Sequence, residues 1–128
     1  MDLSPNYLEM NISVGIDIEG IDKFKNLVEK YGKNFLGKIF TDKEIEKIPS
    51  KNKFLYYALG FSFKESIWKA LPTKIQKKVF FKDIEVIWQG QNPFFKIKNF
   101  YSDYALNFFV CKNRKKKFVI TLVFLFRK

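Results

Sequence analysis

The sequence predicts an α+β domain in which an antiparallel sheet packs against one long helix. Two observations support this fold class. Apolar residues at helical spacing dominate the first half of the 128-residue chain, and alternating or apolar runs between turn residues dominate the second half. Helices gathered early and antiparallel strands gathered late are typical of α+β folds. The length corresponds to one domain, which we expect over residues 13–128, behind an N-terminal extension of residues 1–12.

Residues 14–19 form the first expected strand, because apolar and polar residues alternate there. The alternation places Gly15, Asp17 and Glu19 on one face. Residues two apart on one face are separated by roughly 6.5 to 7 Å at Cα, so both carboxylates can approach one cation. Gly15 has no side chain, and we expect it to leave room for a ligand beside the acids. The structural alternative is the solvated face of an edge strand.

Short helices follow this strand. We expect them over residues 21–31, 34–40 and 42–48. Gly32 ends the first of them. Thr41 and Glu44 form a capping box at the start of the third, in which each side chain bonds the backbone amide of the other residue.

A long helix is expected next, over residues 52–71. It ends there because the residue before Pro72 is pushed out of the helical region. Phe61, Glu65 and Lys69 recur every four residues and share one helix face. Glu65 and Lys69 are also an ordinary surface ion pair at this spacing, so taken alone they do not indicate a site.

The second half of the chain is expected to form strands. They are predicted over residues 84–88, 94–98, 104–111 and 118–126. Turn residues join the first two, and the lysine-rich residues 112–117 join the last two as a solvated turn. The apolar run 118–126 is about half as long as a membrane span, which favours a buried strand and a protein that does not cross a membrane.

Three carboxylates and two lysines would converge if the first strand and the long helix packed together. Mg²⁺ prefers oxygen ligands and usually takes one or two protein carboxylates plus the phosphate oxygens of a substrate. Asp17, Glu19 and Glu65 are therefore candidate metal ligands. Lys64 and Lys69 are candidates to neutralise phosphate oxygens. This inventory indicates a Mg²⁺ site for a phosphate-bearing substrate.

The order and spacing of these residues resemble the 4′-phosphopantetheinyl transferase superfamily. Its first signature, an apolar-Gly-x-Asp strand, corresponds to residues 14–17, and its second, a helix bearing Lys, Glu and a further Lys, corresponds to residues 61–69. Asp17 and Glu65 are 48 positions apart, as the family pattern requires. Each signature alone is weak, but the pair at this separation is specific. The resemblance covers about residues 12–110 and implies the α+β fold of that superfamily.

The resemblance implies a transferase reaction. The 4′-phosphopantetheine arm of coenzyme A is transferred to a serine of an acidic acyl or peptidyl carrier protein, and 3′,5′-ADP is released. By resemblance, Asp17 and Glu65 bind Mg²⁺ at the pyrophosphate of coenzyme A, with Glu19 as a third ligand. The carrier would serve fatty-acid, polyketide or peptide synthesis.

The resemblance also assigns roles to the helix residues. Glu65 is the candidate base for the serine proton, and Lys69 stabilises the charge that builds on the pyrophosphate. Lys64 and Ser66 are expected to contact coenzyme A beside Lys69. Phosphoryl transfer depends on positioning and electrostatic stabilisation, so this reaction needs no nucleophile from the enzyme.

The chain departs from the family in one respect. Members commonly carry a Ser-x-Ser-His-like motif near the coenzyme A pyrophosphate, and this chain has no histidine. Residues 94–110 offer only Ser102 and Asp103 as polar substitutes. A relative that binds coenzyme A or a carrier protein without turnover is therefore the alternative to an active transferase.

Two types of family member are compared with this chain. The Asp17-Ile18-Glu19 version of the first signature resembles the surfactin-synthetase-activating type, which contains two such domains in tandem. The length resembles the small holo-acyl-carrier-protein synthases. A single domain lacks the second lobe of the tandem type, so by resemblance the site lies between protomers, and we expect a homo-oligomer, either a trimer or a dimer.

The charge is strongly basic, with 24 Lys and Arg against 13 Asp and Glu, a net +11. A basic surface would steer an acidic carrier protein and coenzyme A toward the site. Nucleic acid is the competing partner, since basic residues cluster within 112–117 and aromatic residues alternate with lysines within 94–100. We consider nucleic acid the less probable partner, because charge runs are usually solvated.

A cytoplasmic location is expected. The single cysteine, Cys111, cannot form an internal disulfide. Residues 1–13 contain charged residues and a proline, which do not fit the apolar core of a signal peptide.

Overall fold

The computed structural model describes residues 12–98, 104–113 and 115–127. The expected N-terminal extension lies outside this part except for Ile12, and Ser102 and Asp103 lie outside it as well. Within these residues the order begins with β1 (Ile12–Gly20), continues through short helices into the long helix α5 (Lys53–Ala70), and ends in four strands. The predicted order of early helices and late antiparallel strands is therefore confirmed.

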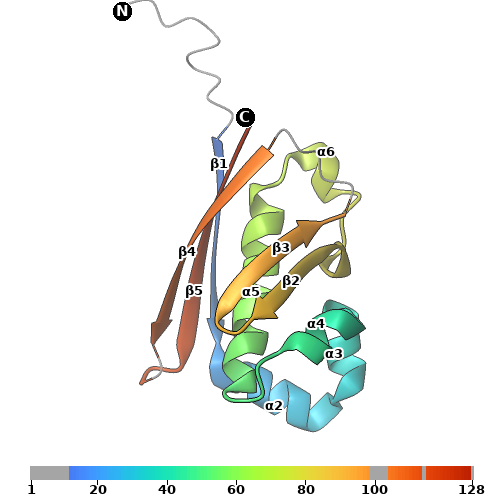
Figure 1. The fold of residues 1–128 in the computed structure, drawn as a ribbon, viewed down its shortest axis with the longest axis vertical. Helices are drawn as coiled ribbons and strands as arrows, with labels where there is room; N and C mark the ends of the chain where they lie inside the picture. Colours follow the sequence, from blue (N-terminus) through green and yellow to red (C-terminus); the bar gives the residue numbers. More distant parts are fainter. Residues whose placement is uncertain (1–11, 99–103, 114, 128) are drawn as a thin grey trace, which may run out of the picture.

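Two antiparallel sheets lie on either side of the central helix α5 (Figure 1). The larger sheet has the order β1-β5-β4, where β4 is Tyr104–Asn113 and β5 is Phe118–Arg127. The smaller sheet is the hairpin of β2 (Ile84–Gln89) and β3 (Asn92–Ile97). The predicted fold class is correct, but the strands form two sheets because α5 has an apolar surface on more than one side.

The core is built around α5, which is buried along most of its length. Phe63 of α5 packs edge-on against Phe95 and Phe108, with ring centroids 5.0 and 5.3 Å away. One aromatic cluster thus joins the helix to both sheets. Helix α5 ends at Ala70, before Pro72, as its sequence predicts.

Three short helices cover one end of α5 (Figure 1). They are α2 (Ile21–Tyr31), α3 (Lys33–Ile39) and α4 (Asp42–Lys47). Gly32, with φ of 55°, separates the first two, which explains why glycine stands there. The capping box of Thr41 and Glu44 is present at the start of α4. The short helix α6 (Thr73–Gln76) and the 3₁₀ turn η1 (Phe81–Asp83) carry no periodic pattern and were not predicted.

The turn between β2 and β3 is tighter than predicted. Gln89 pairs with Asn92, so only Gly90 and Gln91 form the turn, and Gly90 has φ of 61°. Strand β3 therefore begins before Pro93 rather than after it. This proline is tolerated because β3 pairs with β2 on one side and is an edge strand.

The outer face of the larger sheet is apolar and uncovered. Ile12, Val14, Ile16 and Ile18 of β1 are 49 to 62% exposed. On β4, Phe109 is 64% exposed. Strand β1 thus turns its apolar residues outward and its acidic residues toward α5, which is the reverse of an ordinary amphipathic strand.

Candidate functional site

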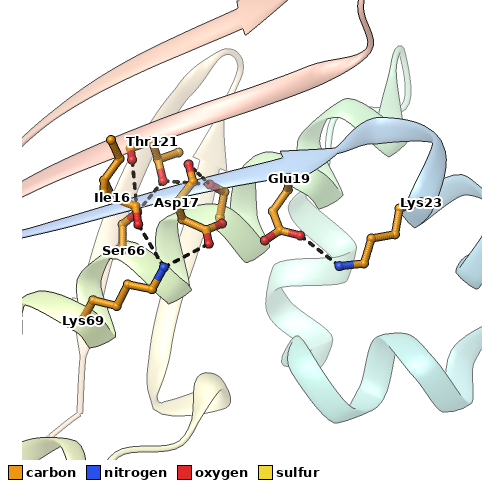
Figure 2. Close-up of polar contacts among 8 residues, drawn as sticks. Ile16, Asp17, Glu19, Lys23, Ser66, Lys69 and Thr121 are labelled. Atoms are coloured by element: carbon orange, nitrogen blue, oxygen red, sulfur yellow. Dashed lines mark hydrogen bonds and ion pairs between the residues drawn. The ribbon is translucent and has the colours of Figure 1, made fainter.

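Two carboxylates of β1 lie in the interface between the larger sheet and α5. Asp17 and Glu19 are each 9% exposed and extend from the same side of the strand (Figure 2). Both acids are therefore removed from most solvent, which rules out the solvated-face alternative for this strand.

A close helix–strand contact brings α5 to these acids. A Cβ atom built on Gly15 would lie 1.8 Å from the carbonyl oxygen of Ser66, closer than any real contact. Glycine is required because the backbones meet at this point. The expectation that Gly15 leaves room for a ligand is therefore wrong: the helix occupies that space.

Three buried hydroxyls hold the helix against the sheet. The Thr121 hydroxyl lies 2.8 Å from the Ser62 hydroxyl and 2.7 Å from the Ser66 hydroxyl, and all three residues have no exposed surface. Ser62 also donates to the backbone carbonyl of Asp17 at 3.3 Å. The cluster therefore connects the central strand, the helix and the backbone of a candidate metal ligand.

This burial bears on Ser66, which is expected by resemblance to contact coenzyme A. Its hydroxyl is fully enclosed and is bonded to both the side chain and the carbonyl of Thr121, the latter at 3.2 Å. It has no surface on which coenzyme A could rest. Its function is to position the helix.

Lys69 stands at the open edge of the site. Its ammonium donates to the carbonyl of Ile16 at 3.0 Å and to Asp17 Oδ1 at 3.4 Å (Figure 2). The lysine side chain is 44% exposed, so it can also reach an incoming anion. The second carboxylate oxygen, Asp17 Oδ2, is buried and has no hydrogen-bond partner. A buried carboxylate oxygen without a donor is costly, and it marks a position suited to a cation.

The surroundings of Glu19 and Glu65 disfavour the charged forms of these two acids. Burial, followed by the neighbouring Asp17 carboxylate, raises the pKa of Glu19 to about 7 against the opposing effect of Lys23. Lys23 donates to Glu19 at 3.2 Å. Burial and the charge of Asp17 also raise the pKa of Glu65, although Lys69 opposes this shift. Glu65 therefore interacts electrostatically with both Asp17 and Lys69.

The donor set fits a magnesium ion. Within the described part of the chain, no three acidic, cysteine or histidine side chains are gathered closely enough to enclose a metal by themselves. Mg²⁺ does not need such an enclosure, since it keeps waters and takes substrate phosphates beside one or two carboxylates. The unpartnered Asp17 Oδ2 and the raised pKa of Glu19 are both relieved by a bound cation.

The structure places Lys64 away from these residues. Its ammonium has no exposed surface and lies 2.8 Å from Glu44 Oε1, on another face of α5. Lys64 thus offers no exposed charge to the expected cofactor in this structure, because a protein carboxylate already neutralises its ammonium. The reading of Glu44 as a cap is correct, but this residue is buried as well.

A cavity of about 370 Å³ opens beside Glu65. It is lined by Glu65, Trp68, Val79, Phe80 and Phe81. The walls are apolar except for the carboxylate, so the cavity fits an uncharged chain presented next to Glu65.

Comparison with known proteins identifies the family. The model of the 4′-phosphopantetheinyl transferase superfamily matches residues 13–123. The chain belongs to this superfamily. The expected resemblance is thereby confirmed.

Two curated relatives illustrate the similarity. The holo-[acyl-carrier-protein] synthase of Maridesulfovibrio salexigens is 44% identical over 77 residues, which is 60% of this chain and 62% of the relative. That of Carboxydothermus hydrogenoformans is 44% identical over 82 residues, 63% of this chain and 66% of the relative. The chain thus matches less than two thirds of the length of either relative.

Solved structures share the fold. The ACPS–CoA complex of Chronobacterium ammoniagenes has a TM-score of 0.71 at 19% identity and covers 91% of this chain and 98% of that one. The holo-[acyl-carrier-protein] synthase of Neisseria meningitidis has a TM-score of 0.65 at 21% identity and covers 88% and 96%. The fold of this superfamily is therefore present over almost the whole described chain.

Sequence reasoning missed two residues that shape the site. Thr121 lies inside the run 118–126, which its composition predicts only as a buried strand, although a single hydroxyl in a central strand is a signal for a buried polar partner. Lys23 was not singled out, although it lies four residues after Glu19. The partners of Thr121 are 59 and 55 positions away, so no local pattern shows them, whereas the four-residue spacing of Glu19 and Lys23 is a signal that the sequence does offer.

Proposed function

We propose that this protein transfers the 4′-phosphopantetheine arm of coenzyme A to a serine hydroxyl of an apo acyl carrier protein, with Mg²⁺ and release of 3′,5′-ADP. The observation that carries the proposal is the buried, unpartnered oxygen of Asp17 beside Lys69, on the two elements that bear the family signatures. The synthase names of the curated relatives support it.

In this proposal Asp17 and Glu65 hold Mg²⁺, and Glu19 is a third oxygen ligand. The metal, when bound, neutralises pyrophosphate oxygens and makes the phosphorus more electrophilic. Lys69 stabilises the leaving side, because its exposed ammonium already lies at the mouth of the site.

Glu65 takes the proton of the carrier serine. The serine oxygen forms the new bond to phosphorus, the pyrophosphate bond breaks, and the electron pair leaves on 3′,5′-ADP. A carboxylate whose pKa is raised by burial is a better proton acceptor than an exposed one. The apolar cavity beside Glu65 is suited to the uncharged pantetheine arm. This arm is part of coenzyme A, which is bound in two solved structures of the same fold.

The active form is proposed to be a homo-oligomer, a trimer or a dimer. The exposed apolar residues of β1 and β4 are the supporting observation, since exposed apolar faces of this kind are typical of subunit interfaces. An acidic carrier protein suits the net charge of +11. None of the helices in the described ranges is long and apolar enough to cross a membrane. A cytoplasmic location stays a prediction.

The test is the mass of an apo carrier protein after incubation with coenzyme A and Mg²⁺. We expect the mass to increase by one phosphopantetheine, and this increase to disappear with a chelator and in Glu65→Gln and Asp17→Asn. Glu46→Gln, which removes an exposed acid of α4, is the matched control and should react like the unmodified protein. Binding of coenzyme A without any mass increase would instead identify a non-catalytic relative, and salt-sensitive retention on an oligonucleotide column would favour nucleic acid.

A further inference from the structure

A buried ion pair lies next to the proposed site but outside its chemistry. Lys64 and Glu44 are 0% and 1% exposed, and their charged atoms are 2.8 Å apart. Removing two charges from water costs free energy that their attraction seldom exceeds by much, so an apolar pair of similar volume would often be as stable. This cost suggests a role beyond stability for the pair.

The ammonium of Lys64 is fully engaged by the protein. It donates to Glu44 Oε1 and to the backbone carbonyls of Phe81 and Ile84, the first two at 2.8 Å. An ammonium has three hydrogens, and all three are used. Burial lowers the pKa of Lys64, and the neighbouring Glu44 carboxylate opposes this shift.

Glu44 joins two further segments to the same point. Its Oε1 accepts the amide of Thr41 at 3.0 Å, and its Oε2 accepts the amide of Val86 at 2.9 Å. The pair therefore connects the start of α4, the middle of α5 and the corner where η1 becomes β2. An apolar pair could fill the volume but could not hold these backbone groups.

The corner held by Lys64 forms the wall of the cavity beside Glu65. Phe81, whose carbonyl Lys64 binds, lines that cavity with Val79 and Phe80. Glu65, the residue that follows Lys64 on the helix, lines the same cavity. The Lys64 ammonium thus holds the cavity wall at Phe81 in place relative to the Glu65 carboxylate.

We propose that Lys64, held by Glu44, is a positioning residue that sets the shape of the cavity beside Glu65 for an uncharged amide-and-methylene chain. The inference rests on the proposed function, in which that chain is the pantetheine arm. Lys64 does not touch the substrate. It acts through the Phe81 carbonyl.

The decisive variants are Lys64→Met and the double change Lys64→Met with Glu44→Gln. The single change leaves a buried carboxylate unpaired, which threatens folding. The double change removes both charges and keeps similar volumes, so it preserves a folded protein for measurement. Leu55→Ala is the matched control, because it creates a cavity in the core at the other end of α5, roughly 15 Å along the helix from Glu65.

Two readouts separate positioning from stability. In the transfer assay, below the melting temperature of every variant, we expect the KM for coenzyme A to rise roughly tenfold or more in the double variant while Leu55→Ala changes it less than about twofold. An unchanged KM and kcat in a folded double variant would overturn the inference.

The second readout does not require activity. Trp68 lines the cavity, and its indole N–H donates to the carbonyl of Gln76 at 3.2 Å. We expect its indole ¹H–¹⁵N resonance to shift in the double variant but not in Leu55→Ala. If the unmodified protein transferred nothing, the proposed function would fail, while this resonance would still decide whether Lys64 shapes the cavity: a shift supports it, and an unmoved resonance overturns it.

Discussion

Single residues of the site are explained by how they are buried. Asp17 combines one oxygen bonded to Lys69 with one oxygen that has no donor. Glu19 beside it has a raised pKa because burial and a second carboxylate both disfavour its charge. The two carboxylates are therefore poorly stabilised by their surroundings, which supports the proposal that a cation binds between this strand and α5.

This electrostatic arrangement predicts a pH-dependent stability. The folded-state pKa of Glu19 is about 7 against an ordinary 4.5, so the folded protein holds this proton more tightly than the unfolded chain. A carboxyl group with a raised pKa contributes its full stabilisation to the folded state below the pKa of the unfolded chain. This contribution is lost as the pH rises toward the folded-state pKa of about 7. Without metal, Glu19→Gln should therefore melt roughly 3 to 6 °C higher than the unmodified protein at pH 8 and close to it at pH 4.5.

Thermal melts in chelator test this prediction, with Glu46→Gln as the control for loss of an exposed charge. Glu19→Gln also removes the ion pair with Lys23. This loss should change the melting temperature little, because the lysine side chain is 59% exposed. Added Mg²⁺ should raise the melting temperature of the unmodified protein more than that of Glu19→Gln. A variant that melts lower than the unmodified protein at pH 8 would contradict the prediction.

At the scale of secondary-structure elements, the site depends on one contact between β1 and α5. Two features fix the position of the helix along the strand. They are the close backbone contact at Gly15 and the hydrogen-bonded hydroxyls of Ser62, Ser66 and Thr121. The helical period then determines where the side chains of Glu65 and Lys69 lie relative to the strand. The functional residues on the helix are thus positioned by residues that perform no chemistry.

Gly15→Ala should disrupt this contact. Its Cβ would overlap the Ser66 carbonyl, so α5 must move away from β1 and separate Lys69 from Asp17. We expect a loss of at least about 1 to 3 kcal/mol in unfolding free energy, as for other overpacked cores, together with loss of transfer activity. Urea unfolding and the mass assay measure the two effects.

Gly37→Ala is the matched control for this change. Nothing lies within 4 Å of a Cβ at Gly37, and the residue is inside α3. Alanine should stabilise the protein there by about 0.5 to 1 kcal/mol. If Gly15→Ala behaved in the same way, the close contact would not be what positions the helix.

At the scale of the whole molecule, the uncovered apolar face of the larger sheet is the main unexplained surface. Strand β1 contributes side chains at least 49% exposed, and Phe109 of β4 is 64% exposed. The same strand carries the candidate metal ligands on its inner face. A second copy bound to the outer face would therefore be separated from the site only by strand β1.

Ile16→Glu tests this surface, because Ile16 lies in the middle of β1 and is 54% exposed. A charge there should prevent association and reduce transfer activity, while the fold persists because the side chain points away from the core. Tyr31→Glu, at an apolar residue of α2 that is 51% exposed, is the control and should leave both unchanged. Analytical ultracentrifugation at micromolar concentration gives the outcome. A fully active, monomeric unmodified protein would contradict the proposed homo-oligomer.

The identity of the main elements and the shared face of Asp17 and Glu19 could be predicted from the sequence. Alternation defined β1, a proline and a four-residue period defined α5, and the spacing of Asp17 and Glu65 indicated their convergence. These features depend on neighbours along the chain, so periodicity and capping rules suffice to predict them.

The tertiary structure alone decided which faces are buried and which charges are free. Sequence reasoning placed Lys64 and Ser66 at the cofactor and an open space at Gly15, and the structure instead shows a buried ion pair, an enclosed hydroxyl and a helix backbone. The reason is that the partners of these residues, Glu44 and Thr121, are 20 and 55 positions away along the chain. No local pattern encodes which distant group a side chain meets, and packing settles it.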